Sequence, residues 1–203
     1  MNGGHGKLFY DNCPDDPAQA GPGVHALVIG MSRYTSDDGK APNGFVDIAG
    51  TAVAAGRFAT WLVEEFHHPK SIPLRTVRLL LSPMNSEKDS LPKDYVPEGA
   101  NYLNVSAALE RWGHDCDSHS GNIAILYVGG HGTATTESAH IFLPEANLHS
   151  DEYLYCINVG TIRELMADCR ARSNIYIVDC CALRSKKIPT FLQWSGLGGP
   201  LFN

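Results

Sequence analysis

Apolar residues along the chain fall into short runs that are separated by polar loops. Four of these runs predict β-strands, at residues 24–30, 74–81, 122–128 and 174–178. The runs at 122–128 and 174–178 lack polar alternation, so we expect both faces of these strands to be buried, as in a parallel sheet. A further short strand is expected at residues 140–143.

Between the strands, apolar residues recur at helical spacing. The first stripe begins after Asp47, which we expect to be the N-cap of a helix, and the third follows Thr161 and Glu164, a capping-box pattern. The stripes comprise Ala54, Phe58, Trp61, Leu62 and Phe66, then Val105, Ala108, Leu109 and Trp112, and finally Ile162, Leu165, Met166 and Cys169. This alternation of strands and helices predicts an α/β fold, a three-layer α/β/α sandwich with a mostly parallel sheet.

The length and composition fit one domain. A chain of 203 residues with 43% hydrophobic residues can bury a sizeable core. Residues 1–23 contain Pro14, Pro17, Pro22 and several glycines, which is typical of a flexible leader. We therefore expect a leader at 1–23 and a single domain at 24–203.

The charge and the cysteine content limit the kinds of partner and the cellular location that we expect. The net charge of −6 supplies no basic field for a phosphate backbone, so a nucleic-acid partner is not expected. No apolar run approaches the roughly 18 residues of a membrane-spanning helix, so no membrane partner is expected either. The six cysteines show no C-x-x-C spacing and no secretory signal precedes them, which indicates reduced thiols and a cytoplasmic location.

Two motifs follow the buried strands directly. Gly129-Gly130-His131-Gly132 comes after the strand at 122–128, and Asp179-Cys180-Cys181 comes after the strand at 174–178. The carboxyl ends of parallel strands meet at one edge of a sheet, where ligands bind and catalytic residues are found. The glycines leave the imidazole of His131 open to a cleft. A catalytic cysteine nucleophile needs at least a thiol and an imidazole close to it.

Other chemistries fit the same residues less well. A phosphate cradle at the glycines lacks the lysine of a P-loop and the G-x-G-x-x-G spacing. A zinc site at His131, Cys180 and Cys181 would need two ligands on adjacent residues, which is poor tetrahedral geometry. A second His/Cys/Asp cluster lies in an expected loop at residues 114–119, with a spacing that matches no zinc pattern. No metal ligands are therefore expected.

The two motifs, in this order, resemble those of the caspase-like cysteine peptidases, most closely the bacterial caspase and metacaspase branch. Residues 127–132 are similar to the histidine motif of that family and residues 178–181 to its cysteine motif, and His131 and Cys181 stand 50 residues apart, the spacing of caspase-type enzymes. Residues 25–34 are similar to the family's first strand and the loop that follows it. The resemblance spans residues 24 to about 182.

The resemblance implies a set of roles. Cys181 would be the nucleophile and His131 its base, and the backbone N–H of Gly132 or Cys181 would donate to the oxyanion. Asp179 would line the pocket for the residue before the scissile bond, so that protein or peptide substrates are cleaved after Arg or Lys. Apart from the resemblance, Asp37 and Asp38 follow the first expected strand, and we expect them to add to this acidic pocket. The family implies no cofactor and leaves a calcium dependence open. It also implies a bacterial defence pathway, such as antiviral defence, or cell-death signalling.

The family's sheet continues with strands beyond the cysteine strand, so by resemblance a second polypeptide is expected here. Without such strands the run at 174–178 would form an exposed apolar edge. We expect a partner chain or a cleaved C-terminal fragment to complete the sheet. The alternative function is a catalytically silent caspase-like module that binds or scaffolds other proteins, and retention of both His131 and Cys181 argues against it.

Overall fold

The computed structural model describes most of the chain. The described residues are 8–14, 21–36, 39–41, 44–66, 69–93, 96, 98–134, 138–147 and 155–180, together with the backbone of 183–184.

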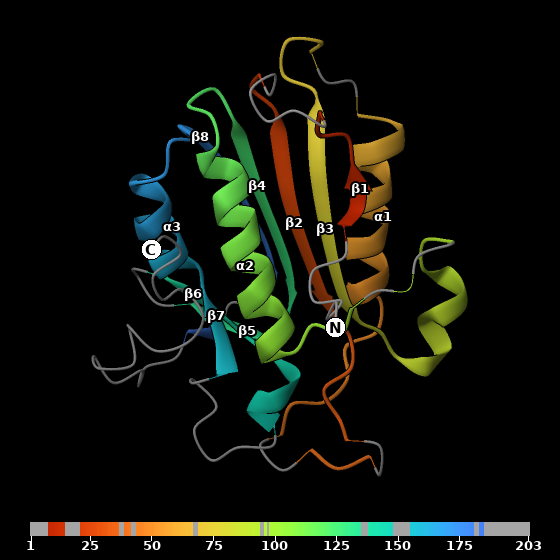
Figure 1. Cartoon of the computed structure of the whole chain (residues 1–203). Helices are drawn as coiled ribbons and strands as arrows, with labels where there is room; N and C mark the ends of the chain where they lie inside the picture. The colour runs from red at the N-terminus through yellow and green to blue at the C-terminus, as the bar shows by residue number, and fades with distance from the viewer. Residues whose placement is uncertain are drawn as a thin grey trace, which may run out of the picture.

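A five-stranded sheet forms the centre of the molecule (Figure 1), with the strand order β1-β3-β2-β4-β8. Its strands are β1 (Leu8–Asp11), β2 (Val24–Met31), β3 (Leu74–Ser82), β4 (Ile123–Gly130) and β8 (Ser173–Cys180). The four longer strands are parallel, and β1 runs antiparallel to β3. The sequence prediction of a mostly parallel sheet is therefore confirmed.

Helices cover both faces of this sheet, an arrangement compatible with an α/β/α sandwich (Figure 1). The helices are α1 (Thr51–Glu64), α2 (Tyr102–Asp117) and α3 (Val159–Ala167). Alternate residues of β2 point to opposite sides: Leu27 and Ile29 pack in the core that contains α2 and α3, and Ala26 and Val28 in the core that contains α1. All four are fully buried, because each face of this strand lies under a helix.

A smaller sheet with the order β7-β6-β5-β9 continues from the end of β4. Its strands are β5 (Gly132–Ala134), β6 (Ala139–Phe142), β7 (Cys156–Asn158) and β9 (Leu183–Arg184). Two short 3-10 helices, Asn85–Ser90 and Pro144–Asn147, complete the described elements. Since β4 ends at Gly130 and β5 begins at Gly132, His131 is the single residue that connects the two sheets at this point.

Part of the expected flexible leader is an ordered strand. Within residues 1–23, Leu8–Asp11 pairs with β3, and the backbone N–H of Asn12 donates to the carbonyl of Arg75. The side chains of Phe9 and Tyr10 pack on the core beneath α1. These four residues lie at the edge of the sheet, because β3 offers an open edge that the short apolar segment can occupy.

The expected N-caps were wrong. Helix α1 begins at Thr51 after Gly50, whose φ of 95° is left-handed, and Asp47 lies outside the helix. Helix α3 is capped by Asn158, whose side chain accepts a hydrogen bond from the backbone N–H of Thr161. The expected loop at 114–119 is helical up to Asp117.

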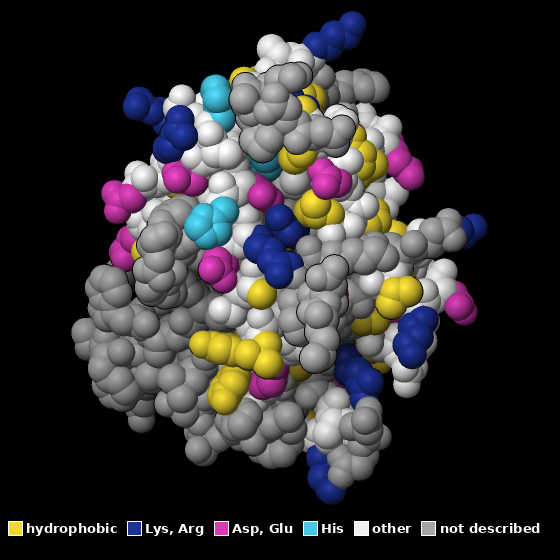
Figure 2. Space-filling view, viewed as in Figure 1, with side chains coloured by type: hydrophobic (Ala, Val, Ile, Leu, Met, Phe, Trp, Pro, Cys, Tyr) yellow, Lys and Arg dark blue, Asp and Glu magenta, His cyan; other side chains and the backbone are white. Residues whose placement is uncertain are grey.

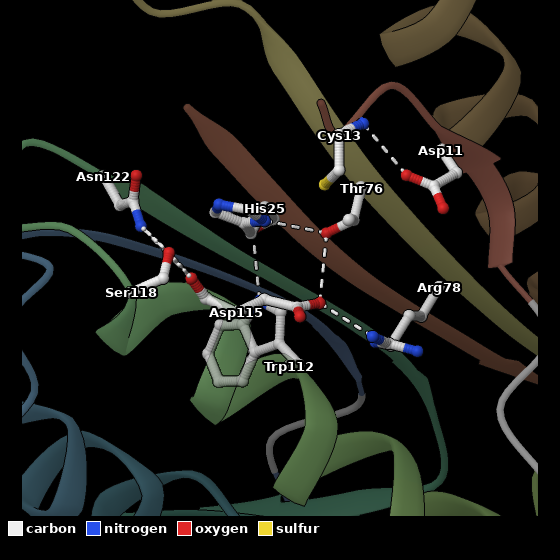
Figure 3. A network of polar contacts seen from close by, with 9 residues as sticks. All are labelled: Asp11, Cys13, His25, Thr76, Arg78, Trp112, Asp115, Ser118 and Asn122. Carbon is white, nitrogen blue, oxygen red and sulfur yellow. Dashed lines mark hydrogen bonds and ion pairs between the residues drawn. The ribbon is translucent and has the colours of Figure 1, made fainter. Parts of the chain in front are cut away.

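A buried polar network joins β2, β3 and α2 at the amino-terminal end of the sheet (Figure 3). His25 Nδ1 lies 2.9 Å from Thr76 Oγ1, which donates to Asp115 Oδ2 at 3.3 Å. Arg78 forms an ion pair of 2.7 Å with the same carboxylate oxygen, and Trp112 Nε1 donates to the carbonyl of His25. Burial lowers the pKa of His25, although the nearby Asp115 acts in the opposite direction.

Strand β8 is less buried than the sequence predicts. Ile175 is 47% exposed and Val178 is 36% exposed, whereas the uninterrupted apolar run predicted burial on both faces. Within the described residues, β8 pairs only with β4 and is the last strand of its sheet. An edge strand lacks the neighbours that bury a central strand, which explains the difference.

Candidate active site

The two sequence motifs follow neighbouring strands. Strands β4 and β8 are paired in parallel from Ile123 and Ser173 to Gly130 and Cys180. His131 directly follows the last residue of β4, so it lies at the carboxyl edge of the sheet, as expected. Cys181 lies outside the described residues, as do Asp37 and Asp38.

The ring of His131 is held by a backbone carbonyl. Its Nε2 lies 2.6 Å from the carbonyl oxygen of Val46, in the loop between β2 and α1. Because a carbonyl oxygen only accepts hydrogen bonds, Nε2 carries a proton. In the neutral ring Nδ1 is then the free acceptor, the state that a general base requires.

Aromatic side chains fix the plane of the imidazole. The Tyr34 ring meets it edge-on at a centroid distance of 4.7 Å, and the Phe45 ring lies at 5.5 Å. The Tyr34 hydroxyl accepts a hydrogen bond of 2.8 Å from the backbone N–H of His131 and donates one of 3.0 Å to the carbonyl of Phe142. Tyr34 therefore holds both the ring and the backbone of His131.

Close packing explains the glycines around His131. A Cβ at Gly130 would overlap the Tyr34 hydroxyl, so a side chain at this position would force Tyr34 to move. A Cβ at Gly132 would lie 2.7 Å from the Sγ of Cys180. The glycines therefore serve close packing of the chain around the histidine, in addition to the open access that the sequence suggested.

Adjacent residues at the end of β8 have different surroundings. The side chain of Cys180 packs, half-buried, against the core on the α2 side and against the backbone of Gly132. Asp179 is exposed, and its Oδ2 accepts a hydrogen bond of 3.0 Å from the hydroxyl of Tyr127 in β4. Tyr127 in turn belongs to the core on the α1 side and stacks on Phe58 at 5.0 Å.

The electrostatics of this pair follow from burial. Desolvation raises the pKa of Tyr127, and the adjacent charge of Asp179 raises it further. The phenol therefore stays protonated and acts as a donor to Asp179. Among the described side chains no lysine or arginine pairs with Asp179, so its charge is open to a cationic ligand.

Four of these residues were not singled out as site residues from the sequence: Tyr34, Phe45, Val46 and Tyr127. Tyr34 and Tyr127 lie inside residues 25–34 and 127–132, two of the segments that the sequence analysis singled out, which is a signal that could have found them. Val46 acts through its backbone carbonyl, and no sequence pattern marks that contribution.

A metal centre finds no support in the described part of the chain, where no three His, Cys, Asp or Glu side chains gather into a possible ligand set. Among the helices described, none is long and apolar enough to cross a membrane.

No protein-family model matches the chain, and no curated protein matches it significantly.

Proposed function

We propose that this chain is a caspase-like cysteine endopeptidase in which Cys181 is the nucleophile and His131 the base. The observation that carries the proposal is the contact of 2.6 Å between His131 Nε2 and the Val46 carbonyl, at the edge where β4 and β8 end side by side. It leaves Nδ1 as the acceptor for a thiol proton. Cys181 directly follows Cys180, the last residue of β8, in the sequence.

The reaction would proceed through a thioester. The Cys181 thiolate attacks the carbonyl carbon of the scissile peptide bond, and the backbone N–H of Gly132 or Cys181 donates to the oxyanion. The C–N bond then breaks as His131 transfers the proton to the leaving amine. Water, deprotonated by His131, hydrolyses the thioester and restores the thiol.

The proposed specificity is for Arg or Lys before the scissile bond. Asp179 supports it, because its carboxylate is two residues from the nucleophile, is exposed, and keeps one oxygen free of the Tyr127 hydrogen bond. A carboxylate in this position attracts a cation and repels an acidic side chain. Asp37 and Asp38 remain part of this proposal as further acidic groups.

A second polypeptide is proposed to pair with β8. The exposed Ile175 and Val178 on this edge strand support it, since an uncovered apolar edge pairs readily with another strand. Native mass spectrometry of the full precursor should detect the added chain or fragment, and Ile175→Lys should release it. An active monomer with no added strand would rule the partner out.

The function is tested with a peptidyl electrophile that carries Arg at the position before the reactive group. We expect covalent attachment at Cys181, located by peptide mass spectrometry, and no attachment after His131→Ala. A matched probe with Asp in place of Arg should react at least about ten times more slowly. Absence of attachment in the folded protein, with its partner present, would favour the silent binding module instead. The proposed cytoplasmic role in bacterial defence or cell death rests on the family resemblance.

A further inference from the structure

One loop supplies most of the contacts to the His131 side chain. This loop connects β2 to α1 and contains Tyr34, Phe45 and Val46, which meet the imidazole through two rings and one carbonyl. Tyr34 stands near the start of the loop and Val46 near its end. The position of the imidazole therefore depends on how the two ends of the loop are held together.

Asp47 holds these ends together with its carboxylate. Its Oδ1 accepts hydrogen bonds of 2.8 Å from the backbone N–H of Tyr34 and of 2.8 Å from that of Thr35. Its Oδ2 accepts a third, of 3.1 Å, from the hydroxyl of Thr35. The backbone N–H of Ile48 also donates to the carbonyl of Ser32 at 2.7 Å.

The carboxylate form is the one that these contacts need. Burial alone would raise the pKa of Asp47, but the hydrogen bonds from Thr35 and Tyr34 outweigh it and lower the pKa. The two backbone N–H groups can only donate, and both donate to Oδ1, while the Thr35 hydroxyl donates to Oδ2 of the ionised carboxylate. An asparagine has the same shape but carries no charge, so its hydrogen bonds to these N–H groups are weaker.

We propose that Asp47 is a positioning residue for His131. It fixes the adjacent Val46 carbonyl against Nε2, so that the imidazole keeps its proton on Nε2 and presents Nδ1 as the acceptor. This inference rests on the proposed function only where it concerns catalysis, because the effect on the tautomer and orientation of the ring follows from the loop geometry itself.

The first test measures the tautomer directly. Long-range ¹H–¹⁵N NMR of the full chain should show neutral His131 protonated on Nε2. In Asp47→Asn we expect a mixture of the two tautomers, while Asp47→Glu should restore part of the original spectrum. An unchanged tautomer in folded Asp47→Asn would overturn the proposal.

The matched control is Asp117→Asn. Asp117 Oδ1 also accepts a backbone hydrogen bond of 2.7 Å, from Arg170, at the far end of α2. This variant loses a comparable contact and should leave the His131 spectrum unchanged. If Asp117→Asn shifted the spectrum as much as Asp47→Asn at equal stability, the effect would be a general loss of structure and the proposal would be wrong.

The second test measures turnover of an Arg substrate. A small displacement of a catalytic group costs about 100-fold in rate, so Asp47→Asn should lower kcat about 10- to 100-fold with KM nearly unchanged. A changed KM with unchanged kcat would contradict the positioning role. If no form of the protein cleaves peptides but the tautomer shifts as expected, the proposed function fails and the positioning of His131 by Asp47 stands.

Discussion

The hydroxyl of Tyr127 donates a hydrogen bond of 3.0 Å to Oδ2 of Asp179 and so ties β4 to the edge strand β8. The bond is formed next to the carboxyl ends of both strands, two residues before Cys181. It orients the carboxylate without neutralising it, because the raised pKa keeps the phenol uncharged. A packed aromatic side chain thus supports an exposed acidic group beside the proposed nucleophile.

The first prediction concerns this pair. Asp179→Asn should lower kcat/KM for Arg substrates at least about 10-fold, because a charge-assisted contact with the substrate is lost. Tyr127→Phe should lower it less, about two- to five-fold, and reduce the free energy of unfolding by about 1 kcal/mol through loss of one hydrogen bond. Fluorogenic tetrapeptides and urea unfolding measure the two effects. Cleavage after Asp by the native protein would refute the proposed role of Asp179.

The second prediction separates the two adjacent cysteines. Cys181→Ala should abolish peptide cleavage, whereas Cys180→Ala should keep most of it, because the Cys180 side chain is already packed against Gly132 and the core. Adjacent residues of a strand point to opposite faces, so the two thiols should not share one position. Iodoacetamide at mildly acidic pH should label Cys181 first, since a thiolate beside an imidazolium has a lowered pKa.

The opposite result would be informative. If Cys180→Ala removed activity and Cys181→Ala did not, the assignment of the nucleophile would be wrong by one residue. Unfolding curves of both variants provide the control, because Cys180 contributes to the core and its truncation should cost a small amount of stability.

The third prediction is a loss of stability in acid that depends on His25. Burial lowers the pKa of His25 below the ordinary value of 6.5, so below that pH the unfolded chain takes up a proton that the folded chain resists. The stability present above pH 6.5 should therefore fall as the pH decreases toward the folded-state pKa. His140, whose pKa is also lowered by burial, should act in the same direction.

Urea unfolding at several pH values between about 7.5 and 5 tests this prediction. His25→Gln removes the titrating group, so its stability should fall less steeply with pH than that of the native protein. The variant should start from a lower stability at neutral pH, because the contact with Thr76 changes. If the unfolding free energies of the two proteins fell equally steeply with decreasing pH, His25 would not be the group that causes the acid sensitivity.

The fourth prediction concerns the glycine before His131. In Gly130→Ala the new methyl group would overlap the Tyr34 hydroxyl and lie 3.0 Å from Met31 Cε, so Tyr34 must move. We expect a loss of about 1–3 kcal/mol in unfolding free energy together with a marked loss of activity. Gly99→Ala is the control, because a Cβ there meets only Asn101 Nδ2, at 3.8 Å. Equal effects of both substitutions would contradict the role of Tyr34.

On the face that carries α2, the acidic side chains of the described residues do not gather into one patch (Figure 2). Figure 2 shows acidic and basic side chains intermingled there, among the residues that are coloured. The net charge of −6 therefore supplies no directional field on this face. The charge that matters for the proposed specificity is the local carboxylate of Asp179.

The sequence by itself determined the central sheet and the place of His131. Apolar runs such as residues 24–30 and 122–128 are short, lack polar alternation and form strands covered on both faces, which buries nearly all of their side chains. The order of strands and helices then required parallel pairing, and parallel pairing puts the end of every strand at one edge. His131 follows one of those ends, so its position could be predicted from local pattern alone.

Tertiary structure decided which groups surround that histidine. Asp47 is a residue type that often caps a helix N-terminus. Its carboxylate instead accepts hydrogen bonds from the backbone N–H groups of Tyr34 and Thr35, which are 12 or more residues away in the sequence. The start of α1 instead donates from Ala52 N–H to the hydroxyl of Ser32. Side-chain acceptors serve either a local or a distant donor, and the packing of the loop against β2 selects the distant one.

Contacts between distant segments also decided the formation of β1 and the role of the Val46 carbonyl. Leu8–Asp11 becomes a strand only because β3 offers a free edge, and four residues carry too little pattern to reveal it. Every residue has a carbonyl oxygen, so no sequence feature distinguishes the one that meets His131 Nε2. Contacts between segments far apart in the chain depend on where the backbone runs, and that is set only when the two cores pack against the sheet.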